Sequence, residues 1–200
     1  QTGEDTPQTP PAHASTAASE PRALIDAAER TINQDGVGAL KARDLADEIG
    51  VAVGSLYNLA RDLDTIVLEV ASRTLARLDA EIAAVGEATS SLPPADRLVV
   101  IAIAYRRFAS ANRPAWRSLF VRRVDAEIGL PEWAVAERSQ LFRHVFDPLA
   151  ELIPGAGEDA CRELAVTLFS AIHGIVWLSL EGDLVRVPET TVDRQIEILV

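Results

Sequence analysis

The stretch LKARDLADEIGVAVGSLYNLARDLDTI, from Leu40 to Ile66, decides the fold of this chain. A helix-turn-helix packs two short helices across a tight turn, and this geometry makes three demands on the sequence. The crossing of the helices needs a small residue, Ala46, and the turn needs a residue that tolerates positive φ, Gly50. An apolar residue, Leu56, must hold the second helix against the first. The three positions are in register and predict a helix-turn-helix over Lys41 to Leu59, with a generic helical hairpin as the alternative.

Apolar residues at helical spacing continue outward from this stretch, without an alternating strand pattern or an internal repeat. The chain is therefore expected to be all-α, with about nine helices. These helices are expected at residues 20–35, 41–48, 53–59, 62–86, 94–113, 115–125, 131–153, 158–181 and 188–200. Pro148 is expected to kink the helix over 131–153. The helix over 158–181 is apolar almost all round, which favours burial in a core or a dimer interface over a membrane span.

Three segments are expected along the chain. Residues 1–19 are rich in Pro, Thr, Ala, Ser and Gln and predict a disordered tail; they hold no Lys or Arg and no apolar run, so they do not resemble a signal peptide. Residues 20–65 would form the helix-turn-helix domain, and residues 66–200 a larger ligand-binding and dimerisation domain. The single cysteine, Cys161, excludes an intramolecular disulfide and fits a cytoplasmic protein.

The formal net charge of −11 is unusual for a protein that binds nucleic acid. Residues 20–70, which include the helix-turn-helix, hold five basic residues against ten acidic ones. Binding to phosphates must therefore come from the local placement of a few cations and not from bulk attraction.

The N-terminal quarter resembles the tetracycline-repressor (TetR) family over about Arg22 to Val70. The motifs that carry the resemblance are Arg43-Asp44-Leu45-Ala46, Gly50-Val51 and Gly54-Ser55-Leu56-Tyr57. This resemblance implies a three-helix DNA-binding domain followed by a long connecting helix. Two positions depart from the family pattern: most members have an aromatic residue where Ala60 stands, and a phosphate-binding Lys where Leu63 stands.

The third helix, over 53–59, is expected to enter the major groove of DNA. Asn58 could pair with an adenine edge, and the resemblance gives Tyr57 a phosphate contact. The expected DNA-binding residues are Lys41, Arg43, Val53, Ser55, Tyr57, Asn58 and Arg61. For each of them, a solvated surface position is the alternative.

The C-terminal half is expected to hold an effector site within the fifth to eighth helices. The candidate ligand-binding residues are Tyr105, Trp116, Phe120, Phe142, His144, Phe169, His173 and Trp177. The His173-Gly174 pair resembles a TetR ligand-domain type that carries His-Gly in its penultimate long helix. His173 is the first choice for a polar contact with the ligand, and core packing against Gly174 is the alternative. Neither His144 nor His173 has a second ligand one turn away, so no metal or cofactor is expected.

These features predict a ligand-responsive repressor that binds double-stranded operator DNA of palindromic sequence as a homodimer. The helices over 158–181 and 188–200 would form the dimer surface, and a small, mostly apolar effector would release the DNA. The alternative is a TetR-like ligand-binding protein with weak or lost DNA binding, which the acidic N-terminal region, Ala60 and Leu63 favour. An enzyme is not expected, because the sequence shows no nucleophile with a base partner and no phosphate loop.

Overall fold

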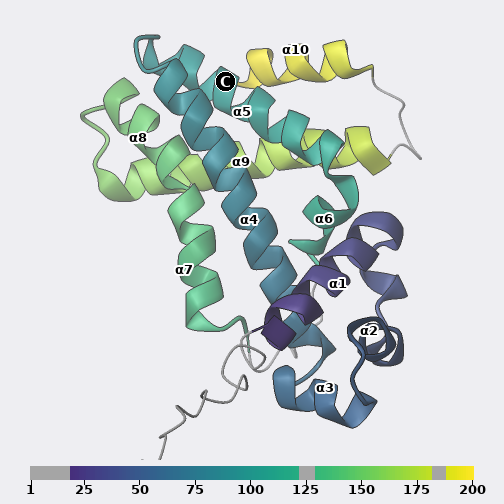
Figure 1. Cartoon of the computed structure of the whole chain (residues 1–200). Coiled ribbons are helices and arrows are strands. Elements are labelled where there is room, and N and C mark those ends of the chain that lie inside the picture. Colours follow the sequence, from purple (N-terminus) through teal and green to yellow (C-terminus); the bar gives the residue numbers. More distant parts are fainter. Residues whose placement is uncertain (1–18, 122–128, 182–187) are drawn as a thin grey trace, which may run out of the picture.

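The computed structural model describes residues 19–121, 129–181 and 188–200, and within these ranges it contains helices and no strand (Figure 1). The N-terminal helices form one compact unit, which we call the head. Its elements are α1 (Ser19–Asp35), the short 3₁₀ helix η1 (Val37–Ala39), α2 (Ala42–Ile49) and α3 (Val53–Leu59). The remaining helices form the body: α4 (Leu63–Ala88), α5 (Pro94–Ala111), α6 (Arg113–Ser118), α7 (Glu132–Leu141), α8 (Arg143–Leu152), α9 (Glu158–Glu181) and α10 (Glu189–Leu199). The all-α fold with an N-terminal helix-turn-helix is confirmed.

The head has its own apolar core, which is separate from that of the body. Leu24 and Ile32 of α1, Leu45 of α2 and Leu56 of α3 are almost fully buried, because each helix turns one apolar face inward. Ile66 at the beginning of α4 completes this core. The three short helices are thus held together by packing, which isolated helices of this length need in water.

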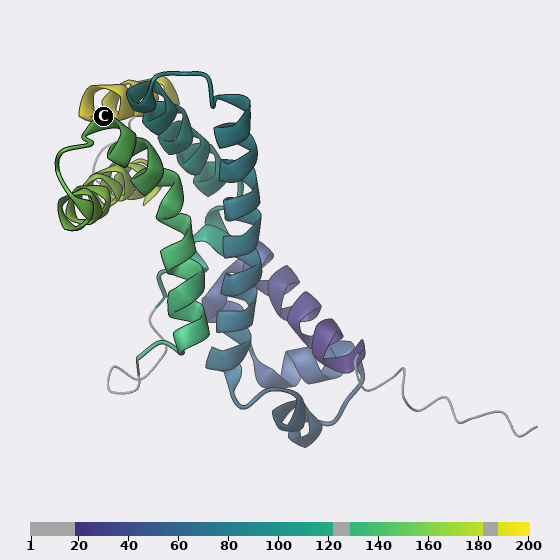
Figure 2. The ribbon, with the colours of Figure 1, turned by 90° about the vertical axis from the view of Figure 1, so that its left-hand side faces the viewer.

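The long helix α4 connects the head to the body, as Figure 2 shows. It has 26 residues, and its length is therefore about 39 Å. Asp62 caps its first turn, because the carboxylate accepts a hydrogen bond from the backbone N–H of Thr65 at 2.7 Å. One end of α4 packs in the core of the head, and its middle packs against α5 and α7.

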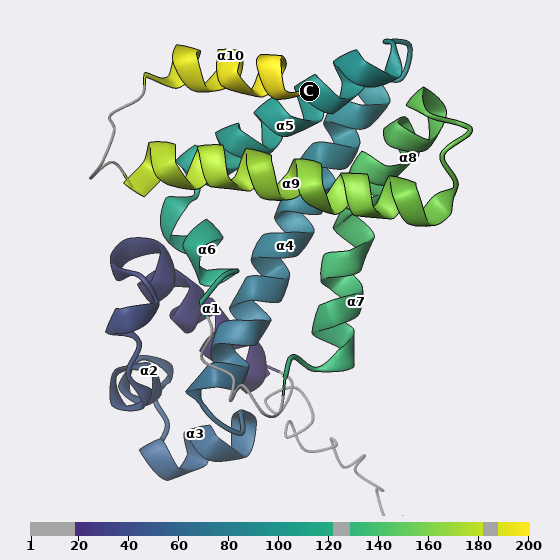
Figure 3. The ribbon, with the colours of Figure 1, turned by 180° about the vertical axis from the view of Figure 1, so that it is seen from behind.

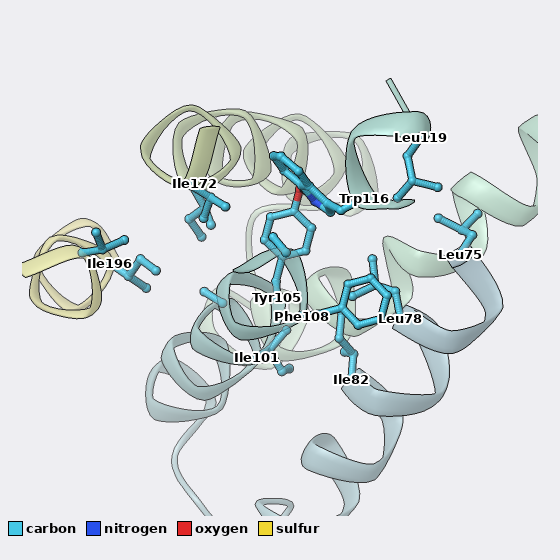
Figure 4. Packing of buried hydrophobic residues seen from close by; sticks show 14 of the residues in the cluster. Leu75, Leu78, Ile82, Ile101, Tyr105, Phe108, Trp116, Leu119, Ile172 and Ile196 are labelled. Carbon is cyan, nitrogen blue, oxygen red and sulfur yellow. The ribbon is translucent and has the colours of Figure 1, made fainter. Parts of the chain in front are cut away.

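The core of the body lies between α4, α5, α6, α9 and α10 (Figure 4). Trp116 of α6 is completely buried and lies above Tyr105 of α5, with Leu78 of α4 on one side and Ile172 of α9 on the other. Aromatic residues of this size contribute much of the apolar area that a small domain can bury.

The predicted helix over 131–153 is in fact two helices, and the break is at Phe142, not at Pro148. The Phe142 N–H bonds to the carbonyl of Ser139 at 3.2 Å and closes α7, while the Phe142 carbonyl accepts from Phe146 at 2.8 Å and starts α8. The division lets α7 pack along α4 and α8 pack against α5, which one straight helix could not do. Pro148 lies inside α8 and is buried.

One further expectation about helices needs correction, and α9 shows how much of its surface a single chain covers. The helix expected over 115–125 begins earlier and ends at Ser118, and residues 122–125 lie outside the described part of the chain. Helix α9 spans the predicted range, yet few of its side chains are buried in the single chain: Cys161, Ala165, Ile172 and Val176. By length and composition alone α9 could cross a membrane, which is weak evidence for a single helix. Figure 3 shows α9 and α10 together on one side of the body.

Candidate functional site

The turn between α2 and α3 has the geometry that the sequence predicts. Gly50 adopts the left-handed conformation with φ 73° and ψ 30°, which a residue with a side chain rarely adopts. The Val51 N–H then bonds to the Ala46 carbonyl at 2.9 Å and closes the end of α2. Ala46 and Leu56 are both fully buried where the two helices cross. The helix-turn-helix is therefore fixed by Gly50, by the small residue and by the apolar anchor.

Helix α3 presents one face to solvent at the end of the head that is farthest from the body (Figure 1). Val53 is 38% exposed and Tyr57 is 49% exposed, and Ser55 and Asn58 are exposed as well. All four candidate residues of α3 can therefore reach a ligand in solution. A short helix with an exposed polar and apolar face is the element that a helix-turn-helix places in the major groove.

The three candidate cations of the head are exposed, and each lies beside a carboxylate of the head. The pairs are Lys41 Nζ to Asp44 Oδ2 at 3.9 Å, Arg43 Nε to Asp47 Oδ2 at 4.0 Å and Arg61 Nε to Asp62 Oδ2 at 3.8 Å. Exposed pairs at these distances are weak, about 1 kcal/mol or less, because water screens them. A phosphate must nevertheless compete with a carboxylate for each of these cations.

The two positions that depart from the family pattern belong to the core of the head. Ala60 is buried, and Leu63 packs against the buried side chains of the head. Leu63 thus contributes apolar area to the junction between α3 and α4, where a Lys would supply a charge. Leu63 thus removes a charge that the family pattern has at this position, whereas Ala60 in place of an aromatic residue changes no charge.

The body contains a cavity of about 260 Å³. Its walls come from α4, α5, α7, α8 and α9 and from the residues that follow α6. The apolar walls include Leu78 and Ile82 of α4, Ile101 of α5 and Ile172 of α9. Concave, mostly apolar spaces of this kind, usually of roughly 300–1,000 Å³, are where proteins bind small molecules.

The structure divides the predicted ligand-binding residues into two groups. Five of them line the cavity: Tyr105, Phe120, Phe142, His144 and Phe169. The other three, Trp116, His173 and Trp177, do not line it and stack beside it in an aromatic cluster. Phe120 joins the two groups, because its ring centroid lies 4.3 Å from that of His173.

A chain of hydrogen bonds orders this aromatic cluster. The Trp116 Nε1–H donates to the Tyr105 hydroxyl oxygen at 3.0 Å, and the Tyr105 oxygen lies 2.8 Å from His173 Nδ1. Burial raises the pKa of Tyr105 and lowers the pKa of His173 below its ordinary value of 6.5. In a neutral His173 one ring nitrogen carries the proton, and in either tautomer Nδ1 makes a hydrogen bond with the Tyr105 hydroxyl. Its Nδ1 is therefore already engaged within the protein.

Asp79 of α4 connects the cavity wall to the corner between α7 and α8. His144 Nε2 lies 2.8 Å from Asp79 Oδ1, and Arg143 Nη2 donates to Asp79 Oδ2 at 2.8 Å. About two turns earlier on α4, the Ser72 hydroxyl donates to Glu137 of α7 at 2.8 Å. Through these contacts α4 is bonded to α7 and α8, two of the helices that line the cavity.

Sequence reasoning did not find two parts of the cavity. It placed the site within the fifth to eighth helices and left out the wall of α4, which supplies Leu75, Leu78 and Ile82. It also left out Arg138, which lines the cavity from α7. The signal for Arg138 is present in the sequence, because Leu141, Phe142 and Val145 follow it at helical spacings of three, four and seven residues.

Among residues 19–121, 129–181 and 188–200, no three His, Cys, Asp or Glu side chains gather as a metal site would require. The chemistry that the described site offers is binding: an exposed helix face in the head, and an apolar cavity in the body.

Two protein-family models match the chain. The model for bacterial regulatory proteins of the tetR family covers residues 24–70. The model for the tetracyclin repressor-like C-terminal domain covers residues 98–200. A helix-turn-helix head on a helical body with a cavity defines a transcriptional regulator with a DNA-binding domain and a C-terminal ligand-binding domain. The chain belongs to the TetR family, which is a family of regulators and not of enzymes.

Solved structures share this fold. A protein of unknown function from Rhodococcus sp. RHA1 is 25% identical, with a TM-score of 0.73 over 90% of this chain and 92% of that one. The TetR family regulator PfmR from Thermus thermophilus is 18% identical, with a TM-score of 0.60 over 88% and 96%. The multidrug binding protein EbrR, solved with imidazole, is 21% identical, with a TM-score of 0.61 over 90% and 94%. A search of curated proteins finds no match.

Proposed function

We propose that this regulator is a repressor that binds a palindromic operator as a homodimer and releases it when a small, mostly apolar effector enters the cavity of the body. One observation carries the proposal: the helix that walls the cavity is the helix that holds the head. Leu75, Leu78 and Ile82 of α4 line the cavity, and Ile66 and Val70 of the same helix pack in the core of the head.

Ion pairs between α4 and α1 support a rigid connection to the head. Arg73 of α4 donates to Asp26 at 2.5 Å and to Glu29 at 3.3 Å, and Arg77 lies 3.0 Å from Glu29. The hydrogen bond from Arg73 holds the pKa of Asp26 below its ordinary range. A tilt of α4 at the cavity should therefore carry α1 and the head with it.

An effector changes operator affinity only if it binds the DNA-incompetent form better than the competent one. The cavity is placed for this, because Asp79 contacts the beginning of α8 at its corner with α7, and Ser72 contacts Glu137 of α7. A ligand that moves the α7–α8 corner should move α4. A coupling of about 1–3 kcal/mol between effector and operator would be ordinary.

We propose that α9 and α10 form the dimer surface. Leu164, Val166 and Leu178 of α9 are exposed in the single chain, as is Ile198 of α10. Leu164 and Leu178 are 14 residues apart and lie on one face of α9, and exposed apolar side chains that gather on one surface mark interfaces. Two heads related by a two-fold axis would read half-sites about 34 Å or a multiple of it apart.

In this proposal α3 lies in the major groove, Asn58 pairs with a base edge and Val53 and Ser55 approach neighbouring bases. Tyr57, Lys41, Arg43 and Arg61 contact the phosphate backbone. A protein that binds operator DNA in this way would act in the cytoplasm.

The second candidate is a ligand-binding member of the family that binds DNA weakly. The pairing of Lys41, Arg43 and Arg61 with carboxylates favours it. A gel shift with the DNA upstream of its own gene, at two salt concentrations, distinguishes the two. The repressor proposal expects specific retardation that an effector reverses. Absence of retardation at low salt would instead support the ligand-binding protein.

A further inference from the structure

The walls of the cavity contain two side chains that can carry a positive charge, Arg138 of α7 and His144 of α8, among residues that are otherwise apolar or aromatic. An apolar effector alone gives these two side chains no partner. The two side chains differ in their hydrogen-bond partners within the protein, and this difference indicates what the cavity binds.

His144 already has a hydrogen-bond partner within the protein, the carboxylate of Asp79. Its Nε2 lies 2.8 Å from Asp79 Oδ1, and its side chain is only 13% exposed. Arg143 lies against the same carboxylate. His144 is therefore part of the contact between α8 and α4, and its Nε2 is already engaged and not available to a ligand.

Arg138 has no such partner among the described residues. Its Nη1 donates to the Ala134 carbonyl at 2.9 Å, one turn earlier in the same helix, and no described carboxylate lies within ion-pair distance. The adjacent carboxylate, Glu137, faces α4 and accepts from Ser72 instead. Burial lowers the pKa of Arg138, with Glu137 acting in the opposite direction.

A guanidinium has five N–H donors in a planar arrangement, and one of them is engaged here. A charge at an apolar wall is costly unless an ion of opposite sign meets it. A carboxylate fits a guanidinium with two parallel hydrogen bonds, which are strong where water is excluded.

We propose that the cavity takes an amphipathic anion, a carboxylate on an apolar body, with the carboxylate bound by Arg138 and the body packed among Leu78, Ile101 and Phe169. This inference rests on the proposed function, since it takes the cavity as the effector site. The cavity of about 260 Å³ equals roughly nine water volumes. A ligand of on the order of ten non-hydrogen atoms therefore fits it.

The same charge should exclude cations. A cationic ligand would bring a second positive charge to Arg138 in a space of low dielectric, where like charges repel strongly. Effector choice in this protein is thus set by the sign of the charge as well as by apolar area.

Three probes of eight carbon atoms each test the proposal: octanoate, octanol and octylamine. Calorimetry on the unmodified full chain at about pH 7.5, where a carboxylate is ionised, gives their affinities. Octanoate should bind at least about tenfold more tightly than octanol, and octylamine most weakly. Equal affinities for octanoate and octanol, or binding of none of the three, would overturn the proposal.

Three variants locate the charge that is responsible. Arg138→Gln should remove most of the advantage of octanoate over octanol, and Arg138→Lys should keep part of it, because a Lys retains the charge without the planar pair of donors. Arg107→Gln makes the same change of charge at an exposed position outside the cavity and should leave the ratio unchanged. A ratio that survives Arg138→Gln, or that falls as far in Arg107→Gln, contradicts the assignment.

A gel shift separates this inference from the proposed function. Octanoate that binds through Arg138 without weakening the complex with operator DNA supports the anion site and contradicts the effector role. If octanol releases the DNA at the same concentration as octanoate, the result supports the effector role and contradicts the anion site. Circular dichroism verifies that each variant is folded. If Arg138→Gln does not fold, the affinities of the three probes for the unmodified chain still test whether the cavity prefers an anion.

Discussion

The hydroxyl oxygen of Tyr105 in α5 lies 2.8 Å from Nδ1 of His173 in α9. The same oxygen accepts the indole N–H of Trp116 in α6. Three helices of the body therefore meet at one buried hydroxyl group. This group is the hydrogen-bond partner of both the Trp116 indole N–H and the His173 Nδ1.

We predict that Tyr105→Phe destabilises the protein by about 1–3 kcal/mol, because the indole N–H and the His173 Nδ1 both lose their partner in a buried place. The free energy of unfolding in urea, followed by tryptophan fluorescence, measures the loss. Tyr57→Phe is the matched control: Tyr57 is 49% exposed, and the change there should stay within about 0.5 kcal/mol. Equal stability of the two variants would contradict the role given to the Tyr105 hydroxyl.

His173 should make stability depend on pH. Burial lowers its pKa in the folded state below the ordinary 6.5, so the unfolded chain takes up a proton first as the pH falls. The contribution of neutral His173 is complete above pH 6.5 and declines as the pH drops below that value. The urea midpoint should fall less steeply with pH in His173→Gln than in the unmodified protein. Identical slopes would show that folding does not change the pKa of His173.

In the head, we predict that Asp47→Asn strengthens DNA binding. The substitution releases Arg43, whose Nε lies 4.0 Å from Asp47 Oδ2, and removes a negative charge near the phosphates. Affinity should rise for all sequences alike, by a few-fold at low salt. The gain should be smaller in an Arg43→Gln background, where only the removal of the negative charge still acts, and a double-mutant cycle tests this. A gain of the same size in both backgrounds would show that the overall charge matters and not the pairing with Arg43.

Two substitutions in the head should separate base reading from phosphate binding. Asn58→Ala should relax preference at one base position, at a cost of about 1–3 kcal/mol for a bidentate contact. Lys41→Ala should weaken binding to every sequence and reduce the slope of affinity against salt by about one unit. Binding measured across a set of operator variants and salt concentrations gives both quantities. If neither substitution alters binding to a fragment that the unmodified protein binds, the contacts proposed for the head are wrong.

For the dimer, Leu178→Asp should yield monomers. Leu178 is 58% exposed in the single chain and faces away from its own core, so a charge there should act on association and leave the fold intact. Leu152→Asp is the control, because Leu152 is 46% exposed and lies in α8, outside the proposed surface. Ile175 is a poorer probe, since it packs against the core of its own chain. A stable monomer of the unmodified protein at micromolar concentration, seen by light scattering, would refute the proposed dimer.

The sequence predicts the helices well where local signals are strong. The helix over 53–59 has the predicted bounds because Gly50 and Leu56 fix the turn and the anchor locally. The range of α9 is predicted as well, because Pro154 and Gly157 precede it and its apolar residues are continuous. Such signals depend on the residue and its near neighbours alone, so they can be read without knowledge of the tertiary structure.

Features that depend on packing between distant helices could not be predicted from such local signals. The break at Phe142 follows from the different partners of α7 and α8, and no residue near position 142 signals it. The apolar sequence of α9 predicts burial in a core or a dimer interface, but it does not say which of its side chains the chain itself covers. The α4 wall of the cavity was missed for a related reason: periodicity identifies the apolar face of a helix, but it does not say whether that face meets a side chain or an empty space.

The uncovered face of α9 has a consequence for the abundance of the protein. If a second copy covers Leu164 and Leu178 as proposed, the protein gains stability by mass action, so its thermal midpoint should rise with its concentration. Newly synthesised chains without a partner would expose this apolar surface to chaperones and proteases. The cell would then remove the regulator fastest when it is scarce, and its half-life would lengthen once dimers form.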